Sequence, residues 1–136
     1  MEEDIIYMPL FLVLAKYKTD GKKYYLNFNH YHNWDFHVRN NLKKKYQAHV
    51  MMLLPRKEYY AVDLTFTLFP GDNRKRDRFN VLSIHDKFFC DALSNSGRIQ
   101  DDNDDFIVES HYRSGPIDRE NPRVEIKIKD MGFNLG

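Results

Sequence analysis

The chain has few of the features that stabilise secreted or membrane proteins. Its single cysteine, Cys90, cannot form an internal disulfide, which is typical of proteins from a reducing compartment. The apolar run "YMPLFLVLA" is too short to cross a bilayer, because a spanning helix needs about 20 apolar residues. We therefore expect a cytoplasmic protein with no membrane association, in which this run forms a buried strand over residues 7–15.

Several signatures of catalysis and metal binding are also missing. The sequence has no glycine-rich phosphate loop and no nucleophile elbow. Three histidines fall within residues 30–37, but their spacing matches no zinc pattern and no cysteine lies nearby. The acidic stretch from Asp101 is not an EF-hand loop, because Phe106 and Tyr112 stand where that loop requires Gly and Glu.

Length and composition predict one folded domain over residues 1–136. A chain of 136 residues is long enough to bury a core but short for two domains. Hydrophobic residues make up 42% and aromatic residues 15%, which argues against disorder and favours a packed domain that contains a β-sheet.

Hydrophobic periodicity predicts the elements of this domain. Alternating apolar residues indicate strands near 60–68 and 123–131, and a weaker pattern indicates one near 106–113. Helical spacing predicts helices near 34–54 and 79–93. We expect Gly21 at the tip of a "KTDGKK" turn and a mobile loop at "NFNHYHN", residues 27–33. The resulting fold class is α+β, with one mixed β-sheet packed against two main helices.

Charged residues are segregated, although the formal net charge is only +1. Two runs are basic, "RNNLKKK" with Arg39, Lys43, Lys44 and Lys45, and "RKRDR" with Arg74, Lys75, Arg76 and Arg78. The run "DDNDD", residues 101–105, is acidic. Basic runs of this kind are either solvated surface or contacts to nucleic acid.

The acids around the second helix could meet at one point. That helix would be ~22 Å long, and an extended return over residues 96–102 would cover about 20 Å. Asp101 and Asp102 would then lie beside Asp77, where carboxylates could bind Mg²⁺ or Mn²⁺ for phosphodiester hydrolysis. The alternative is that Asp77 is a helix-terminal acid and "DDNDD" a turn. Spacing alone favours this alternative.

Three central segments resemble the RusA family of Holliday-junction endonucleases, namely "RKRDRFN", "DKFFCDAL" and "SGRIQDD". The segments "NPRVEIKI" and "YYLNFNHYHN" resemble the closing strand and the Asn-rich loop of that family, so the resemblance covers nearly the whole chain. It implies a RusA-like fold, a homodimer and Mg²⁺- or Mn²⁺-dependent incision of four-way junctions or other branched DNA. Such an enzyme would act in phage recombination or DNA processing.

The resemblance also implies roles for individual residues. Asp77, Asp102 and Lys87 would be catalytic. The metal ligands would be Asp77, Asp101 and Asp102, with Asp86 replacing an acid for which this chain has Phe79. The residues expected to bind DNA are Asn27, Asn29, Lys43, Lys44, Arg74, Lys75, Arg76 and Arg78. Two rival interpretations remain, a DNA-binding protein of this fold without catalysis, and a phage structural or interaction protein.

Overall fold

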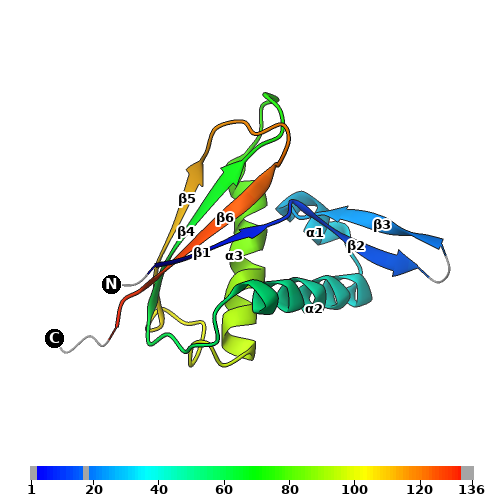
Figure 1. Ribbon diagram of the computed structural model, residues 1–136. Helices are drawn as coiled ribbons and strands as arrows, with labels where there is room; N and C mark the ends of the chain where they lie inside the picture. Colours follow the sequence, from blue (N-terminus) through cyan, green and yellow to red (C-terminus); the bar gives the residue numbers. More distant parts are fainter. Residues whose placement is uncertain (1–2, 17–18, 133–136) are drawn as a thin grey trace.

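A mixed sheet of four strands forms the centre of the computed structural model, which describes residues 3–16 and 19–132 (Figure 1). Its order is β1-β6-β4-β5, and the bounds are β1 Glu3–Met8, β4 Val62–Phe69, β5 Ile107–Ser114 and β6 Arg123–Asp130. Strand β6 pairs antiparallel with β1 and β4, whereas β4 and β5 are parallel. The chain is thus a single α+β domain, as the sequence predicts.

The other elements lie at one side of this sheet. Helices α2, Phe36–Leu53, and α3, Arg78–Asn95, match the two expected helices. The hairpin of β2, Phe11–Lys16, and β3, Thr19–Tyr25, projects from the domain beside α2 (Figure 1). A third, short helix, α1, spans Phe28–Asn33.

Two expectations for the N-terminal segment are wrong. The apolar run at 7–15 is divided between β1 and β2, because Pro9 and Leu10 interrupt it. Gly21 lies inside β3 rather than at the tip of a turn, and of the expected turn over 18–23 only residue 18 lies outside the described residues. A Cβ at Gly21 would come within 2.2 Å of Val13 Cγ1, so glycine permits the close approach of β2 and β3.

The core lies between one sheet face and the helices. Strands β4 and β6 bury every second side chain, namely Val62, Leu64, Phe66, Leu68, Val124, Ile126 and Ile128. Helix α3 packs on β4 and β5, and α2 packs on α3 and β1. Burial of a side chain such as Phe66 contributes about 2–3 kcal/mol. The opposite sheet face is not covered by any helix in the described part of the chain (Figure 1).

Both ends of α3 have capping interactions. Asp77 is the N-cap, and its Oδ1 accepts a hydrogen bond from Phe79 N at 3.0 Å. At the other end Gly97, with φ of 75°, donates to Ser94 O at 3.1 Å, and Arg98 N donates to Leu93 O at 2.9 Å. This is a Schellman motif, for which the left-handed conformation of glycine is favoured. The helix therefore starts and stops at defined positions.

His85 of α3 is fully buried between α2 and the core. Its Nδ1 lies 2.8 Å from the hydroxyl of Tyr46, and the two rings are 5.5 Å apart. Burial lowers the pKa of His85 to about 3, because the charged imidazolium would lose its hydration. The folded protein therefore keeps this imidazole neutral, while the unfolded chain protonates it near pH 6.5.

We predict that the free energy of unfolding falls as the pH drops from 7 to 5. Below about pH 6.5 the unfolded chain binds a proton at His85 that the folded chain excludes, which costs up to about 1.4 kcal/mol per pH unit. Urea unfolding at several pH values measures this slope. His85→Gln should remove most of it, and His37→Gln, at an exposed position of α2, should retain it. An unchanged slope in His85→Gln would contradict the assignment.

Candidate nucleic-acid interface

A groove of about 390 Å³ lies at the N-terminal end of α3. Segments distant in sequence form it, namely the link between β1 and β2, the junction of β3 and α1, the end of β4 with the segment that follows it, the first turn of α3, and the residue before β6. Its wall includes Asn27, Gly71, Asp72, Arg74, Arg76, Val81 and Pro122. The buried side chains of Leu26 and Leu68 form its apolar base. The fold thus gathers one predicted DNA-binding asparagine and two predicted arginines.

Helix α1 is held in place by α3. Asn27 is its N-cap, with Oδ1 accepting from His30 N at 2.8 Å. The amide N of Asn29 donates to Asn80 Oδ1 on α3 at 3.1 Å. The ring of Tyr31 contacts that of Phe88, 6.1 Å between centroids. The expectation of a loop at 27–33 is therefore wrong, because side-chain caps and aromatic packing stabilise a helix that has no regular apolar period.

The two arginines in the groove differ in how much of the side chain is exposed. Arg76 donates to Asp72 through its guanidinium, and its side chain is 30% exposed. Arg74 also pairs with Asp72 but is 85% exposed. The amide of Arg74 and the Arg76 guanidinium, both donating to Asp72, lower the pKa of that carboxyl. Asp72 therefore positions Arg76, while Arg74 extends into solvent, together with the exposed Lys75 and Arg78.

The basic residues of α2 are mostly engaged within the domain. Lys43 is 3.8 Å from Asp91 on α3, and Lys45 donates to the carbonyl of Val13 on β2. Arg39 donates to Tyr31 O at 3.1 Å and lies over the Tyr31 ring. Lys44 is exposed. The run "RNNLKKK" is therefore partly structural.

Asp77 and the Asp101–Asp102 pair do not converge. Asp77 caps the start of α3, whereas Asp102 interacts electrostatically with Asp91 and Cys90 near its end. Asp77 and Asp91 are about 21 Å apart along the helix axis. The expectation that residues 96–102 run back along α3 is wrong. After the Schellman motif, Tyr59 N donates to Arg98 O at 2.6 Å and Ile99 is buried, and these contacts hold the chain at the C-terminal end of the helix. The chain returns along α3 only as β5 (Figure 1).

The acidic run forms a turn at the C-terminal end of α3. Asp101 Oδ1 accepts from Asp102 N at 2.7 Å, and Asn103 Oδ1 accepts from Asp105 N at 2.9 Å. Desolvation, together with Asp101 and the negative charge of Asp91, raises the pKa of Asp102. The acidic run is therefore the turn that residue spacing in the sequence favoured over a metal site shared with Asp77.

Asp86 and Lys87 occupy the middle of α3. Asp86 accepts hydrogen bonds from the Tyr112 hydroxyl at 2.6 Å and from Cys90 Sγ at 3.1 Å. Burial, assisted by Asp86, raises the pKa of both Tyr112 and Cys90, so the Cys90 thiol stays protonated. Asp86 therefore joins α3 to β5, a contact that no sequence pattern indicated. Lys87 is exposed.

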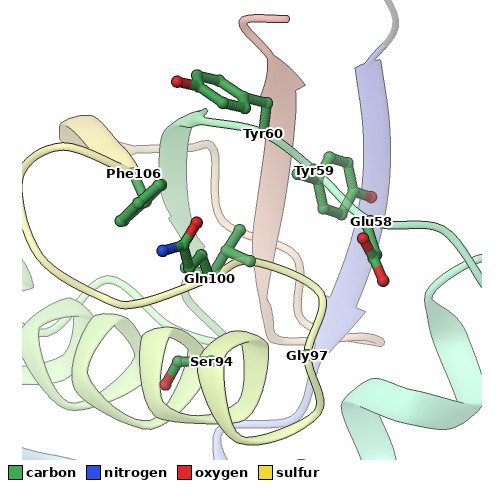
Figure 2. Close-up of a pocket in the computed structure, with 8 residues that line it drawn as sticks. Glu58, Tyr59, Tyr60, Ser94, Gly97, Gln100 and Phe106 are labelled. Atoms are coloured by element: carbon green, nitrogen blue, oxygen red, sulfur yellow. The ribbon is translucent and has the colours of Figure 1, made fainter. Parts of the chain in front are cut away.

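A second hollow, of about 560 Å³, lies at the other end of α3 (Figure 2). Figure 2 shows it between the last turn of α3, with Ser94, and the segment that carries Tyr59 and Tyr60. Phe106, Gln100 and Glu58 also line it, and none of its described lining residues is Lys or Arg. A phosphate backbone requires cations, so this hollow is a poorer nucleic-acid site than the groove.

Comparisons with known proteins add no family assignment. No family model matches the chain, and no curated protein matches it significantly. In the described part of the chain, no helix has both the length and the apolar character needed to cross a bilayer.

We predict that Asn27→Ala lowers the free energy of unfolding by about 1 kcal/mol, because it removes the cap of α1. Asn27→Asp should keep the stability, since Asp caps equally well. If the amide also contacts phosphate, Asn27→Asp should weaken binding to a four-way DNA junction through charge repulsion. Urea unfolding and a gel-shift titration measure the two effects separately. Equal stability of the Ala variant and wild type would refute the capping role.

Proposed function

We propose that this protein binds branched DNA through the groove at the N-terminal end of α3 and its surroundings. The observation that carries the proposal is the gathering of Asn27, at the start of α1, with Arg74 and Arg76, from the segment before α3, in one groove. Arginine and amide side chains, like helix N-termini, are the usual partners of phosphate oxygens. The resemblance to junction endonucleases supplies the branched substrate.

The electrostatics of the groove suit a polyanion. Arg74 is almost fully exposed, and the Asp72 carboxylate that holds Arg76 leaves the pair of arginines with a net positive charge. Lys75 and Arg78, close to these arginines in sequence, add exposed positive charge, and we expect the exposed Lys44 of α2 to contact the same DNA further from the groove. Binding through such groups releases counterions and weakens as the salt concentration rises.

Metal-dependent incision is the second candidate function. The observation that favours it is the raised pKa of Asp102, which results from desolvation and from the neighbouring Asp101 and Asp91, and which a divalent cation would relieve. Asp77 lies at the opposite end of α3, so one Mg²⁺ with first-shell distances of ~2.1 Å cannot contact both acids of one chain. A site that uses both must be shared between two subunits, in keeping with the homodimer that the resemblance implies.

The proposed setting is the cytoplasm of a bacterium or of a phage-infected host, in DNA recombination or processing. A phage interaction protein with a merely solvated surface is the remaining alternative. Junction binding in a metal-free buffer separates the proposed DNA-binding function from this alternative, since only the DNA-binding protein should bind the junction.

We predict that Lys44→Ala with Arg74→Ala lowers junction affinity and reduces the slope of log K against log salt concentration by about 2. Each lost phosphate contact removes about one released counterion. Fluorescence anisotropy at several salt concentrations, in EDTA, measures the slope. Arg56→Ala, which removes an exposed arginine between α2 and β4, is the matched control and should leave it unchanged. An unaltered slope in the double variant would mean that both bases are solvated surface.

The incision hypothesis is tested by cleavage assays on a labelled four-way junction with Mg²⁺ or Mn²⁺. Asp77→Asn and Asp102→Asn should each abolish cleavage without loss of stability, because Asn preserves the cap at 77. Asp35→Asn, at the N-cap of α2, is the control. If the site is shared, mixing the two inactive variants should restore cleavage. Random pairing makes about half of the dimers mixed, and one of the two sites in each mixed dimer has both acids, so roughly a quarter of all sites should be active. No cleavage by wild type would leave DNA binding as the function.

A further inference from the structure

We propose that Asp63, Glu109 and His111 form a binding site for a divalent transition-metal ion on the sheet face that the helices leave uncovered. His111 Nε2 lies 3.1 Å from Asp63 Oδ1 and 3.1 Å from Glu109 Oε2. One potential ligand atom from each residue lies within 4.8 Å of the other two. This site goes beyond the proposed function and shares no residue with the DNA-binding groove or with the acids of α3.

The pairing of β4 with β5 creates this arrangement. Asp63 is the register partner of Glu109, and His111 is paired with Thr65, two residues further along β4. Residues two apart on a strand point to the same face, so all three side chains share the outer face of two hydrogen-bonded strands. Ligands carried by strands are held more rigidly than ligands carried by loops.

The distances permit a metal as well as hydrogen bonds, since 3.1 Å also lies within the range of N–H···O bonds. Two ligands at ~2.1 Å from a metal are about 3.0 Å apart at a right angle and about 3.4 Å apart at a tetrahedral angle, so the imidazole–carboxylate separations would change by only about 0.3 Å on binding. Without a metal, the single ring N–H at Nε2 must be shared between two carboxylates. A divalent ion would neutralise both carboxylates and accept the imidazole lone pair.

The ligand types indicate the class of metal. One imidazole nitrogen with two carboxylate oxygens suits Zn²⁺ and similar transition ions, whereas Mg²⁺ prefers oxygen ligands alone. Asp63 is only 21% exposed, and His111 and Glu109 are 48% and 59% exposed. A hollow of about 220 Å³, also lined by Glu3, Thr65, Lys127 and Lys129, adjoins the ligands. It leaves room for water to complete the coordination, as in zinc sites with three protein ligands.

The test is isothermal titration of the chelator-treated full chain with Zn²⁺, and separately with Mg²⁺, in the absence of DNA. We expect one Zn²⁺ per chain and much weaker binding of Mg²⁺. Asp63→Asn and His111→Ala should each weaken Zn²⁺ binding by about tenfold or more. Thermal unfolding with and without Zn²⁺ is the second readout, since a bound ion should raise the melting temperature of wild type but not that of Asp63→Asn or His111→Ala.

His37→Ala is the matched control, because it removes an exposed imidazole on α2 and should leave Zn²⁺ binding intact. Circular dichroism verifies that each variant is folded. Equal Zn²⁺ affinity in wild type, Asp63→Asn and His111→Ala would overturn the proposal, as would loss of binding in His37→Ala. Unchanged junction affinity in His111→Ala separates this site from the DNA-binding groove, so the two proposals can fail independently.

Discussion

The burial of α3 is the constraint on which the rest of this structure depends. The helix contacts β4, β5, α1 and α2, and eight of its 18 residues are buried. Breaking it would expose Leu82, Phe88 and Phe89 to water, at about 2 kcal/mol or more for each. With its ends set by Asp77 and Gly97, α3 stays one rod of about 27 Å. The DNA-binding groove and the acids near the two ends of α3 are therefore kept apart by the length of that rod.

The two ends of α3 have opposite chemistry. The positive end of the helix dipole meets the carboxylate of Asp77, and the exposed Arg74 lines the groove at this end. The other end, where the dipole disfavours anions, carries Asp91, Asp101 and Asp102, with Lys43 as a partial counterion. Desolvation and the neighbouring acids raise the pKa of Asp102 at this end.

The sheet divides the molecule in a second way. Its inner face is almost wholly apolar and forms the core with α3 and α2. Its outer face carries charged residues, among them Asp63, His111 and Lys127. Because the side-chain period of a strand is two, one hydrogen-bonded framework holds a rigid core on one side and a fixed set of potential ligands on the other.

Much of this fold could be predicted from local sequence. The alternation in β4 and β6, the helical spacing in α2 and α3, and the capping acid at Asp77 were all visible, because burial on one face of a regular element imposes a period on the chain. Local patterns could not predict helix α1, which depends on Asn27 and on its contact with Asn80 of α3.

What only the tertiary structure decided is which distant side chains meet. A period fixes which way a residue points and says nothing about the path of a loop or the pairing of strands. The turn at Gly97 stays at the end of α3 because Tyr59 and the burial of Ile99 hold it there, and this separates Asp102 from Asp77. Asp63 and His111 become neighbours only because β4 and β5 pair in parallel. The sequence alone determined the elements and their apolar faces, while long-range packing and strand register determined the sites.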